Sequence, residues 1–171
     1  IGRAAGLGYP GGPVIDRLAA AGNPEAIPFP RAYLGEEGRF DFSFSGLKSA
    51  VLNYLHQQQQ KGQPVDKNDL AASFQAAVVE VLVEKTLAAA RDRQVQQVLL
   101  AGGVAANSTL RRLLKEHLAK EGIALTVPPL ELCTDNAAMI AAAGYRKFLR
   151  GDFAALDLNA VPNLSLTAGK L

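Results

Sequence analysis

The stretch "LLAGGVAANSTLRRLL", residues 99–114, ends an apolar run in two glycines and then begins a helix within a few residues. The run it closes, "VQQVLLAG" (95–102), is rich in branched and apolar residues and predicts a buried strand. An amphipathic helix is predicted for 107–120, and "ALTVPP" (124–129) predicts a second strand. This strand–helix–strand order predicts the α/β class, with helices covering a sheet that is at least partly parallel.

Helical patterns dominate the rest of the chain. The longest, 67–92, is apolar almost all round and predicts a helix buried between layers. An alanine-rich helix is expected at 136–149, and two earlier helices at about 12–21 and 46–60. The alternating "RFDFS" at 39–43 predicts a short strand.

Three segments differ in composition, and a chain of 171 residues suits one domain or one lobe of a larger protein. Residues 1–65 are loop-rich, and residues 66–150 hold the helix–strand–helix–strand–helix core. Residues 151–171 are expected to form an irregular tail. Because the chain begins with Ile1 and its only methionine is Met139, we expect it to be a piece of a longer protein.

Composition limits the classes of function. A net charge of +2 is too small to indicate nucleic-acid binding by itself. No apolar run approaches the roughly 20 residues that span a bilayer, so no membrane partner is expected. The single cysteine, Cys133, precludes an internal disulfide and fits a cytoplasmic location. His56 and His117 lie too far apart to form a local metal motif.

Gly102 and Gly103 lie where an α/β sheet binds ligands, between the carboxyl end of a strand and the start of a helix. Without a β-carbon, the main chain there can approach a nucleotide or phosphate closely. Asn107 begins the helix and can cap it or hydrogen-bond a ligand hydroxyl. The pattern alone leaves two interpretations open, a ligand site and a tight turn with a capping asparagine, and slightly favours the turn.

Two further junctions have the same character. "YPGGP" (9–13) places Gly12 at a helix start, and Asp16 follows as a first-turn carboxylate that suits the helix dipole or a ribose hydroxyl. Asp135, in "ELCTDN" (131–136), can cap the last helix or contact a metal or phosphate, although one carboxylate cannot hold a metal alone. Together the three junctions predict one wall of a nucleotide cleft.

Four motifs, in order and spread over nearly the whole chain, resemble the TsaD family of threonylcarbamoyl-adenosine synthesis enzymes. They are "GLGYPGGPVIDRLA" (6–19), "FDFSFSGLKSAV" (40–51), "LLAGGVAANSTLR" (99–111) and "CTDNAAMIAAAG" (133–144). The resemblance implies the ASKHA fold, the actin–Hsp70–sugar-kinase architecture in which two lobes enclose a nucleotide cleft. This chain would supply one lobe, a mixed sheet flanked by helices.

The resemblance also implies a reaction. A threonylcarbamoyl group would pass from threonylcarbamoyl-AMP to the exocyclic amine of the tRNA adenosine beside the anticodon, with TsaB-like and TsaE-like proteins as partners. One divalent metal, iron or zinc, would be the cofactor. The residues that the resemblance carries over are Gly12, Asp16 and Asn107 as substrate contacts, Gly102 and Gly103 as the nucleotide-side turn, and Asp135 as a metal ligand.

Parts of the family pattern are missing from this sequence. The HxxxH histidine pair that supplies the other metal ligands is absent, as are an SGGHT-like substrate loop and an acidic DDAxGEAFDK stretch. We therefore expect the parent protein to be the enzyme and the isolated chain to be inactive. Two alternatives stay open: another ASKHA-fold ATPase or sugar kinase, and a non-catalytic scaffold lobe.

Overall fold

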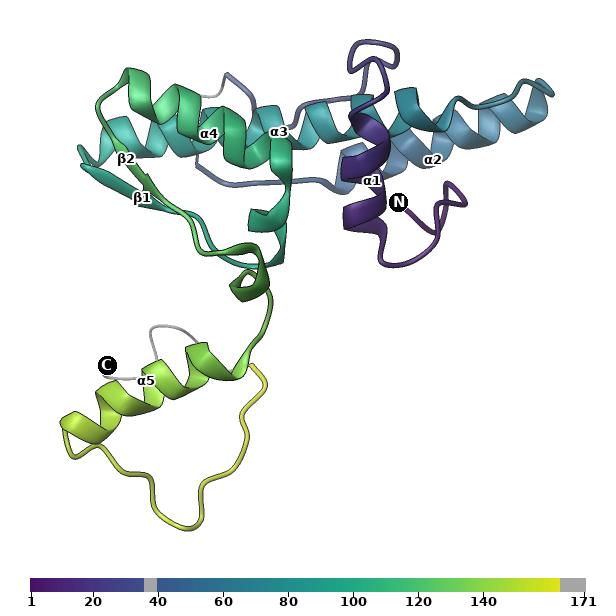
Figure 1. Ribbon diagram of the computed structural model, residues 1–171. Coiled ribbons are helices and arrows are strands. Elements are labelled where there is room, and N and C mark those ends of the chain that lie inside the picture. The colour runs from purple at the N-terminus through teal and green to yellow at the C-terminus, as the bar shows by residue number, and fades with distance from the viewer. Residues whose placement is uncertain (36–39, 164–171) are drawn as a thin grey trace. The chain divides into compact units, whose positions relative to one another are not determined.

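One long helix, α3 (Lys67–Asp92), organises the fold (Figure 1). The computed structural model describes residues 1–35 and 40–163. The Asp66 side chain caps α3 by accepting hydrogen bonds from the first-turn N–H groups of Asn68 and Asp69. Two apolar clusters share this helix, as its nearly uniform apolar sequence predicts. The first contains Ile27, Phe29, Leu47, Val51, Leu70 and Ala77, and the second contains Val79, Val83, Leu87, Leu110, Leu114 and Leu118.

Helices α1 (Gly11–Ala19) and α2 (Ser45–Gln60) lie beside the N-terminal half of α3. The exit from α1 is held close to the start of α3. A β-carbon on Gly22 would lie 2.1 Å from the carbonyl oxygen of Asn68, so only glycine fits there. The N–H of Asn23 donates to the Asp69 carboxylate at 2.8 Å, and the buried Ser73 hydroxyl bonds the same loop. These contacts set the position of α1 on α3.

A strand–helix–strand unit packs on the other half of α3. It consists of β1 (Gln97–Leu99), α4 (Ser108–Lys120) and β2 (Ala124–Thr126), with a short 3₁₀ helix, η1 (Gly103–Ala106), before α4. The two strands are parallel, and Val98 pairs with Leu125. The predicted order of elements is confirmed, but the mixed sheet is not found: in the described ranges the sheet is a parallel pair.

The prediction that 95–102 is a buried strand is wrong in part. Val98 and Leu125 pack against the second apolar cluster, which includes residues of α4. Leu99, on the opposite face of β1, is 71% exposed. Alternation along a strand turns successive side chains to opposite faces, and α4 covers only one of them.

The strand predicted at 39–43 is also not found. Residue 39 lies outside the described residues, and residues 40–43 have no strand assignment. Phe40 and Phe42 instead line a hollow beside the C-terminal half of α3 and β1. Among the described residues this segment has no partner strand with which to form a ladder.

The chain divides into two compact units, the first being Ile1–Thr134 and the second beginning at Asp135. The first includes a second 3₁₀ helix, η2 (Leu130–Leu132). The second contains α5 (Ala137–Leu149), whose residues are not buried. Residues 151–163 have no helix or strand, and the rest of the predicted tail, 164–171, lies outside the described residues. The segment boundaries predicted at residues 65 and 150 stay predictions. Among the described residues, no helix has the length and apolar character needed to cross a membrane.

Candidate functional site

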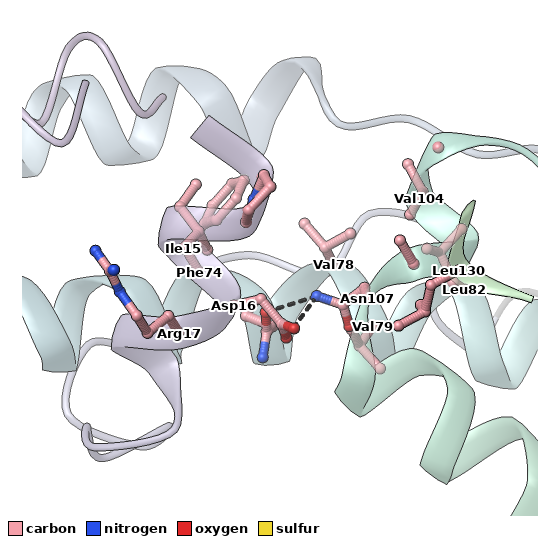
Figure 2. A pocket seen from close by; sticks show the side chains of 15 residues that line it. Ile15, Asp16, Arg17, Phe74, Val78, Val79, Leu82, Val104, Asn107 and Leu130 are labelled. Carbon is pink, nitrogen blue, oxygen red and sulfur yellow. Dashed lines mark hydrogen bonds between the residues drawn. The ribbon is translucent and has the colours of Figure 1, made fainter. Parts of the chain in front are cut away.

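A pocket of about 620 Å³ lies in the first unit, where α1, α3 and η1 meet (Figure 2). Its walls are mostly apolar, with a few polar groups on one side, a composition typical of small-molecule sites. It is lined by Gly12, Pro13, Ile15, Asp16 and Arg17 of α1, Phe74, Gln75, Val78, Val79 and Leu82 of α3, Gly103, Val104, Ala106 and Asn107 around η1, and Leu130.

Asp16 joins α1 to the N-terminus of α4. Its Oδ1 accepts hydrogen bonds from Asn107 Nδ2 at 3.0 Å and from the Ser108 hydroxyl at 2.9 Å. Its Oδ2 accepts the backbone N–H of Ser108 at 3.2 Å. A carboxylate at a helix N-terminus is stabilised by the unpaired N–H groups and by the helix dipole. The prediction that Asp16 lies in the first turn of its own helix is wrong, because α1 begins at Gly11 and has no acidic residue in that turn. Asp16 instead interacts with the N-terminus of α4.

Asn107 is the N-cap of α4. Its Oδ1 accepts the N–H of Leu110 at 2.9 Å, which confirms the capping interpretation. Its Nδ2 donates both to Asp16 and to Gln75 Oε1, the latter at 2.7 Å. Figure 2 shows the side chains of Asp16 and Asn107 pointing toward one another. With both amide hydrogens in use, only the second lone pair of Oδ1 remains for a ligand.

The glycines at the pocket differ in whether the backbone conformation requires glycine. Gly102 has φ +88°, a conformation that disfavours side chains, so the tight-turn interpretation holds at this residue. Gly12 and Gly103 have no such backbone angle, and a β-carbon on either would meet no atom within 4 Å. Their own fold therefore does not require glycine, and both border the pocket.

Four of the six predicted site residues thus lie around one pocket: Gly12, Asp16, Gly103 and Asn107. Gly102 adjoins it in the same turn. Asp135 belongs to the second unit and is exposed. It is not the cap of the last helix, because Asn136 is the N-cap of α5 and accepts the N–H of Met139 at 2.9 Å. Asparagine at this position is as good a cap as aspartate.

The metal prediction receives no support from the donor groups in the described part of the chain. No group of three or more His, Cys, Asp and Glu side chains there is arranged to hold an ion. Asp135 alone does not fit a divalent metal, which needs several ligands. Its assignment as a ligand stays a prediction.

Sequence reasoning missed Gln75, which lines the pocket, and the contacts of Arg111, which does not line it. Gln75 is 7% exposed within the apolar pattern of α3, and its only signal was a polar residue at a core position. Arg111 of α4 joins three segments through its guanidinium. Its guanidinium donates to the carbonyl oxygen of Ala105 in η1, to that of Pro128 at 3.0 Å, and to Cys133 Sγ at 2.9 Å.

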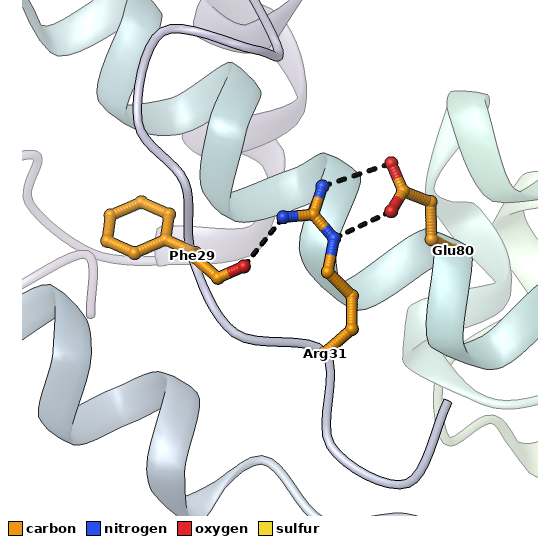
Figure 3. A network of polar contacts seen from close by, with 3 residues as sticks. All are labelled: Phe29, Arg31 and Glu80. Atoms are coloured by element: carbon orange, nitrogen blue, oxygen red, sulfur yellow. Dashed lines mark hydrogen bonds and ion pairs between the residues drawn. The ribbon is translucent and has the colours of Figure 1, made fainter. Parts of the chain in front are cut away.

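A bidentate ion pair holds the loop that follows α1 against α3 (Figure 3). Arg31 donates to the Glu80 carboxylate through Nε at 2.6 Å and Nη2 at 3.1 Å, and its Nη1 donates to the carbonyl oxygen of Phe29. The hydrogen bond from Glu80 raises the pKa of the Arg31 guanidinium. This contact joins the loop to α3 at Glu80, next to Val79, which lines the pocket.

Comparison with known proteins places the chain in a family. A family model described as "TsaD: tRNA N6-adenosine threonylcarbamoyltransferase" matches residues 1–142. The chain belongs to the TsaD family. The match confirms the resemblance given by the four motifs, and it covers every residue assigned from them, from Gly12 to Asp135.

Curated relatives agree with the TsaD family model. The chain is 61% identical over 166 residues to a protein of Moorella thermoacetica, covering 97% of this chain and 48% of that protein. It is 59% identical over 169 residues to one of Bacillus subtilis (98% and 48%) and 53% identical over 166 residues to one of Clostridium botulinum (97% and 48%). Each relative is named tRNA N6-adenosine threonylcarbamoyltransferase. The chain spans about half the length of the curated relatives it matches.

Proposed function

We propose that this chain forms the adenylate-binding wall of an enzyme that transfers a threonylcarbamoyl group from threonylcarbamoyl-AMP to tRNA adenosine. The observation that carries the proposal is the pocket in which Gly12, Asp16, Gly103 and Asn107 meet. A TsaD-family chain has brought together, from segments about 90 residues apart in sequence, the residues that the family resemblance assigns to the adenylate. This favours the transferase over an ATPase, a sugar kinase or a scaffold lobe.

The unused hydrogen-bonding capacity of Asp16 and Asn107 indicates which part of the adenylate would contact the polar side of the pocket. Asp16 Oδ2 accepts one hydrogen bond and Asn107 Oδ1 accepts one, so each oxygen keeps a lone pair. Neither side chain has a spare donor. The pair therefore suits a ligand group that donates, such as the two hydroxyls of a ribose. The apolar walls from α1, α3 and η1 suit the adenine ring.

Backbone groups and Arg17 suit the phosphate. The N-cap of α1, Pro10, makes no side-chain capping hydrogen bond, so the first-turn N–H groups near Gly12 can interact with an anion. Arg17 lines the same pocket and offsets the charge of Asp16. At Gly12 and Gly103 the missing β-carbon leaves room for a close approach to the main chain.

The proposed reaction is an acyl transfer. The exocyclic amine of the tRNA adenosine forms a bond to the carbamoyl carbon, the bond from that carbon to the phosphate oxygen breaks, and AMP leaves as the amine loses a proton. A bound metal would stabilise the developing charge. Asp135 is proposed as one of its ligands, with the others supplied by the family's HxxxH pair outside this chain.

Partners and location follow from the same proposal. Transfer RNA is the acceptor, TsaB-like and TsaE-like proteins are the proposed protein partners, and the metal is proposed to be iron or zinc. The single cysteine, Cys133, and the tRNA substrate favour the cytoplasm.

The proposal is tested with the intact protein, threonylcarbamoyl-AMP and tRNA, measuring threonylcarbamoyl-adenosine in digested tRNA by mass spectrometry. Wild-type protein should form the product, and Asn107→Ala should lower the rate at least about tenfold by removing an acceptor and the α4 cap. His56→Ala, an exposed position on α2, is the matched control and should leave the rate unchanged. Asp135→Ala should lose metal and activity but keep its melting temperature. Product formation at the wild-type rate by both Asn107→Ala and Asp135→Ala would contradict the proposal.

A further inference from the structure

Gln75 is the most buried polar side chain at the pocket, and neither the motifs nor the family resemblance assigned it a role. It lies on α3 with 7% of its surface exposed, and both ends of its amide are bonded. Its Oε1 accepts from Asn107 Nδ2 at 2.7 Å, and its Nε2 donates to the Thr109 hydroxyl at 2.9 Å. Buried amides are bonded in this way as a rule, so satisfaction alone does not indicate a function. What indicates a function is the way in which each hydrogen bond fixes the orientation of the next amide.

The backbone N–H of Leu110 determines the orientation of the whole network. Because that N–H can only donate, Asn107 must turn Oδ1 toward it. Asn107 Nδ2 then faces Asp16 and Gln75, so Gln75 must present Oε1 to it and turn Nε2 toward Thr109. The arrangement has a single consistent assignment of donors and acceptors. Asp16 accepts one of the two amide hydrogens of Asn107, and Gln75 accepts the other.

We propose that Gln75 is a positioning residue that holds the Asn107 amide with both of its donors engaged, so that only acceptors face the ligand. The terminal torsion of an asparagine is broad, so hydrogen bonds rather than rotamer preference fix the plane of the amide. Without Gln75 Oε1, one Nδ2–H is unpaired and the plane can rotate about the remaining bonds. The second lone pair of Oδ1 then loses its fixed direction, and selectivity for a hydroxyl-bearing ligand falls.

This inference rests on the proposed function, because it assumes an adenylate in the pocket. It differs from that proposal in what it predicts. A merely structural Gln75 would affect all ligands of the pocket alike, whereas a positioning Gln75 affects only the ligand hydroxyls that Asn107 accepts from.

The test uses the intact protein and isothermal titration calorimetry with two probes, AMP and 2′,3′-dideoxy-AMP, which differ only in the ribose hydroxyls. The wild-type protein should prefer AMP by about tenfold, the worth of one to two hydrogen bonds. Gln75→Met, which keeps the length but not the hydrogen bonds, should reduce the preference for AMP over dideoxy-AMP to about twofold. Gln75→Glu keeps an acceptor for Asn107 Nδ2 and should retain most of the preference. Because both probes carry the same phosphate, the charge of the glutamate cancels in the ratio.

The outcomes separate the two proposals. If the wild-type protein binds neither probe, the nucleotide site is wrong and the role of Gln75 is overturned with it. If the wild-type protein shows the preference and a folded Gln75→Met protein keeps it, only the role of Gln75 is overturned. Should Gln75→Met fail to fold, Thr109→Val decides: it removes the hydroxyl that fixes Nε2, and the preference should fall about threefold. An unchanged preference in Thr109→Val would then overturn the inference.

Discussion

Replacement of Asp16 by asparagine tests the contact that joins α1 to α4. The carboxylate accepts three hydrogen bonds, two from Ser108 and one from Asn107. An asparagine has a single oxygen, so at least one of these donors would face an NH₂ group. A hydrogen bond to a charged group contributes about 1.5–3 kcal/mol, and less at a half-buried side chain such as Asp16. Loss of charge at the N-terminus of α4 adds about 0.5 kcal/mol.

Together these losses lower the free energy of unfolding by about 2 kcal/mol. Urea-induced unfolding of the intact protein, followed by far-UV circular dichroism, measures the change. Arg17→Gln is the matched control, because Arg17 is exposed on the same helix and should change stability by less than about 0.5 kcal/mol. If Asp16→Asn unfolds within that margin of the wild type, the carboxylate does not join the two helices in the way described.

Two further predictions concern packing and charge. Gly22→Ala places a β-carbon 2.1 Å from the Asn68 carbonyl oxygen, so it should lower the free energy of unfolding in urea by at least about 2 kcal/mol. The control is Gly46→Ala in the first turn of α2, where a β-carbon meets open space. That variant should be neutral or slightly stabilising. Equal stability of these two variants would contradict the close approach. The pKa of Glu121 lies below its usual range because Arg91 donates a hydrogen bond to it, so the pair's stabilisation is present above the unfolded-state pKa and is lost as pH falls through the folded-state value. Arg91→Gln should therefore raise the NMR titration midpoint of the Glu121 carboxyl, and an unmoved midpoint would refute the pairing.

Periodicity predicted helices such as α2 and α4 because each turns apolar side chains toward α3. It did not predict which face of β1 is covered, since Leu99 and Val98 carry equally apolar side chains and only the position of α4 distinguishes them. The "RFDFS" alternation was misassigned for a similar reason: a strand exists only if a partner strand is present.

The candidate site was predictable in part. Glycine pairs at helix starts pointed to Gly12 and Gly103, and the polar residues near those starts pointed to Asp16 and Asn107. The family resemblance then assigned these residues to the adenylate side of the substrate. The bond between Asp16 and Asn107 joins residues 91 apart, so no local pattern could reveal it. Gln75 was hidden inside the apolar pattern of α3, because sequence alone does not show that Asn107 and Thr109 lie opposite it.

We propose that the pocket between α1, α3 and η1 binds an adenine nucleotide. Titration of AMP into the ¹⁵N-labelled intact protein, followed by amide NMR shifts, tests it most directly. We expect saturable shifts of the Gly12, Gly103 and Asn107 amides, whereas the amide of Gly62, in the turn between α2 and α3, should not shift. Saturable binding that leaves the amides of Gly12, Gly103 and Asn107 in place, or no binding at all, would contradict it.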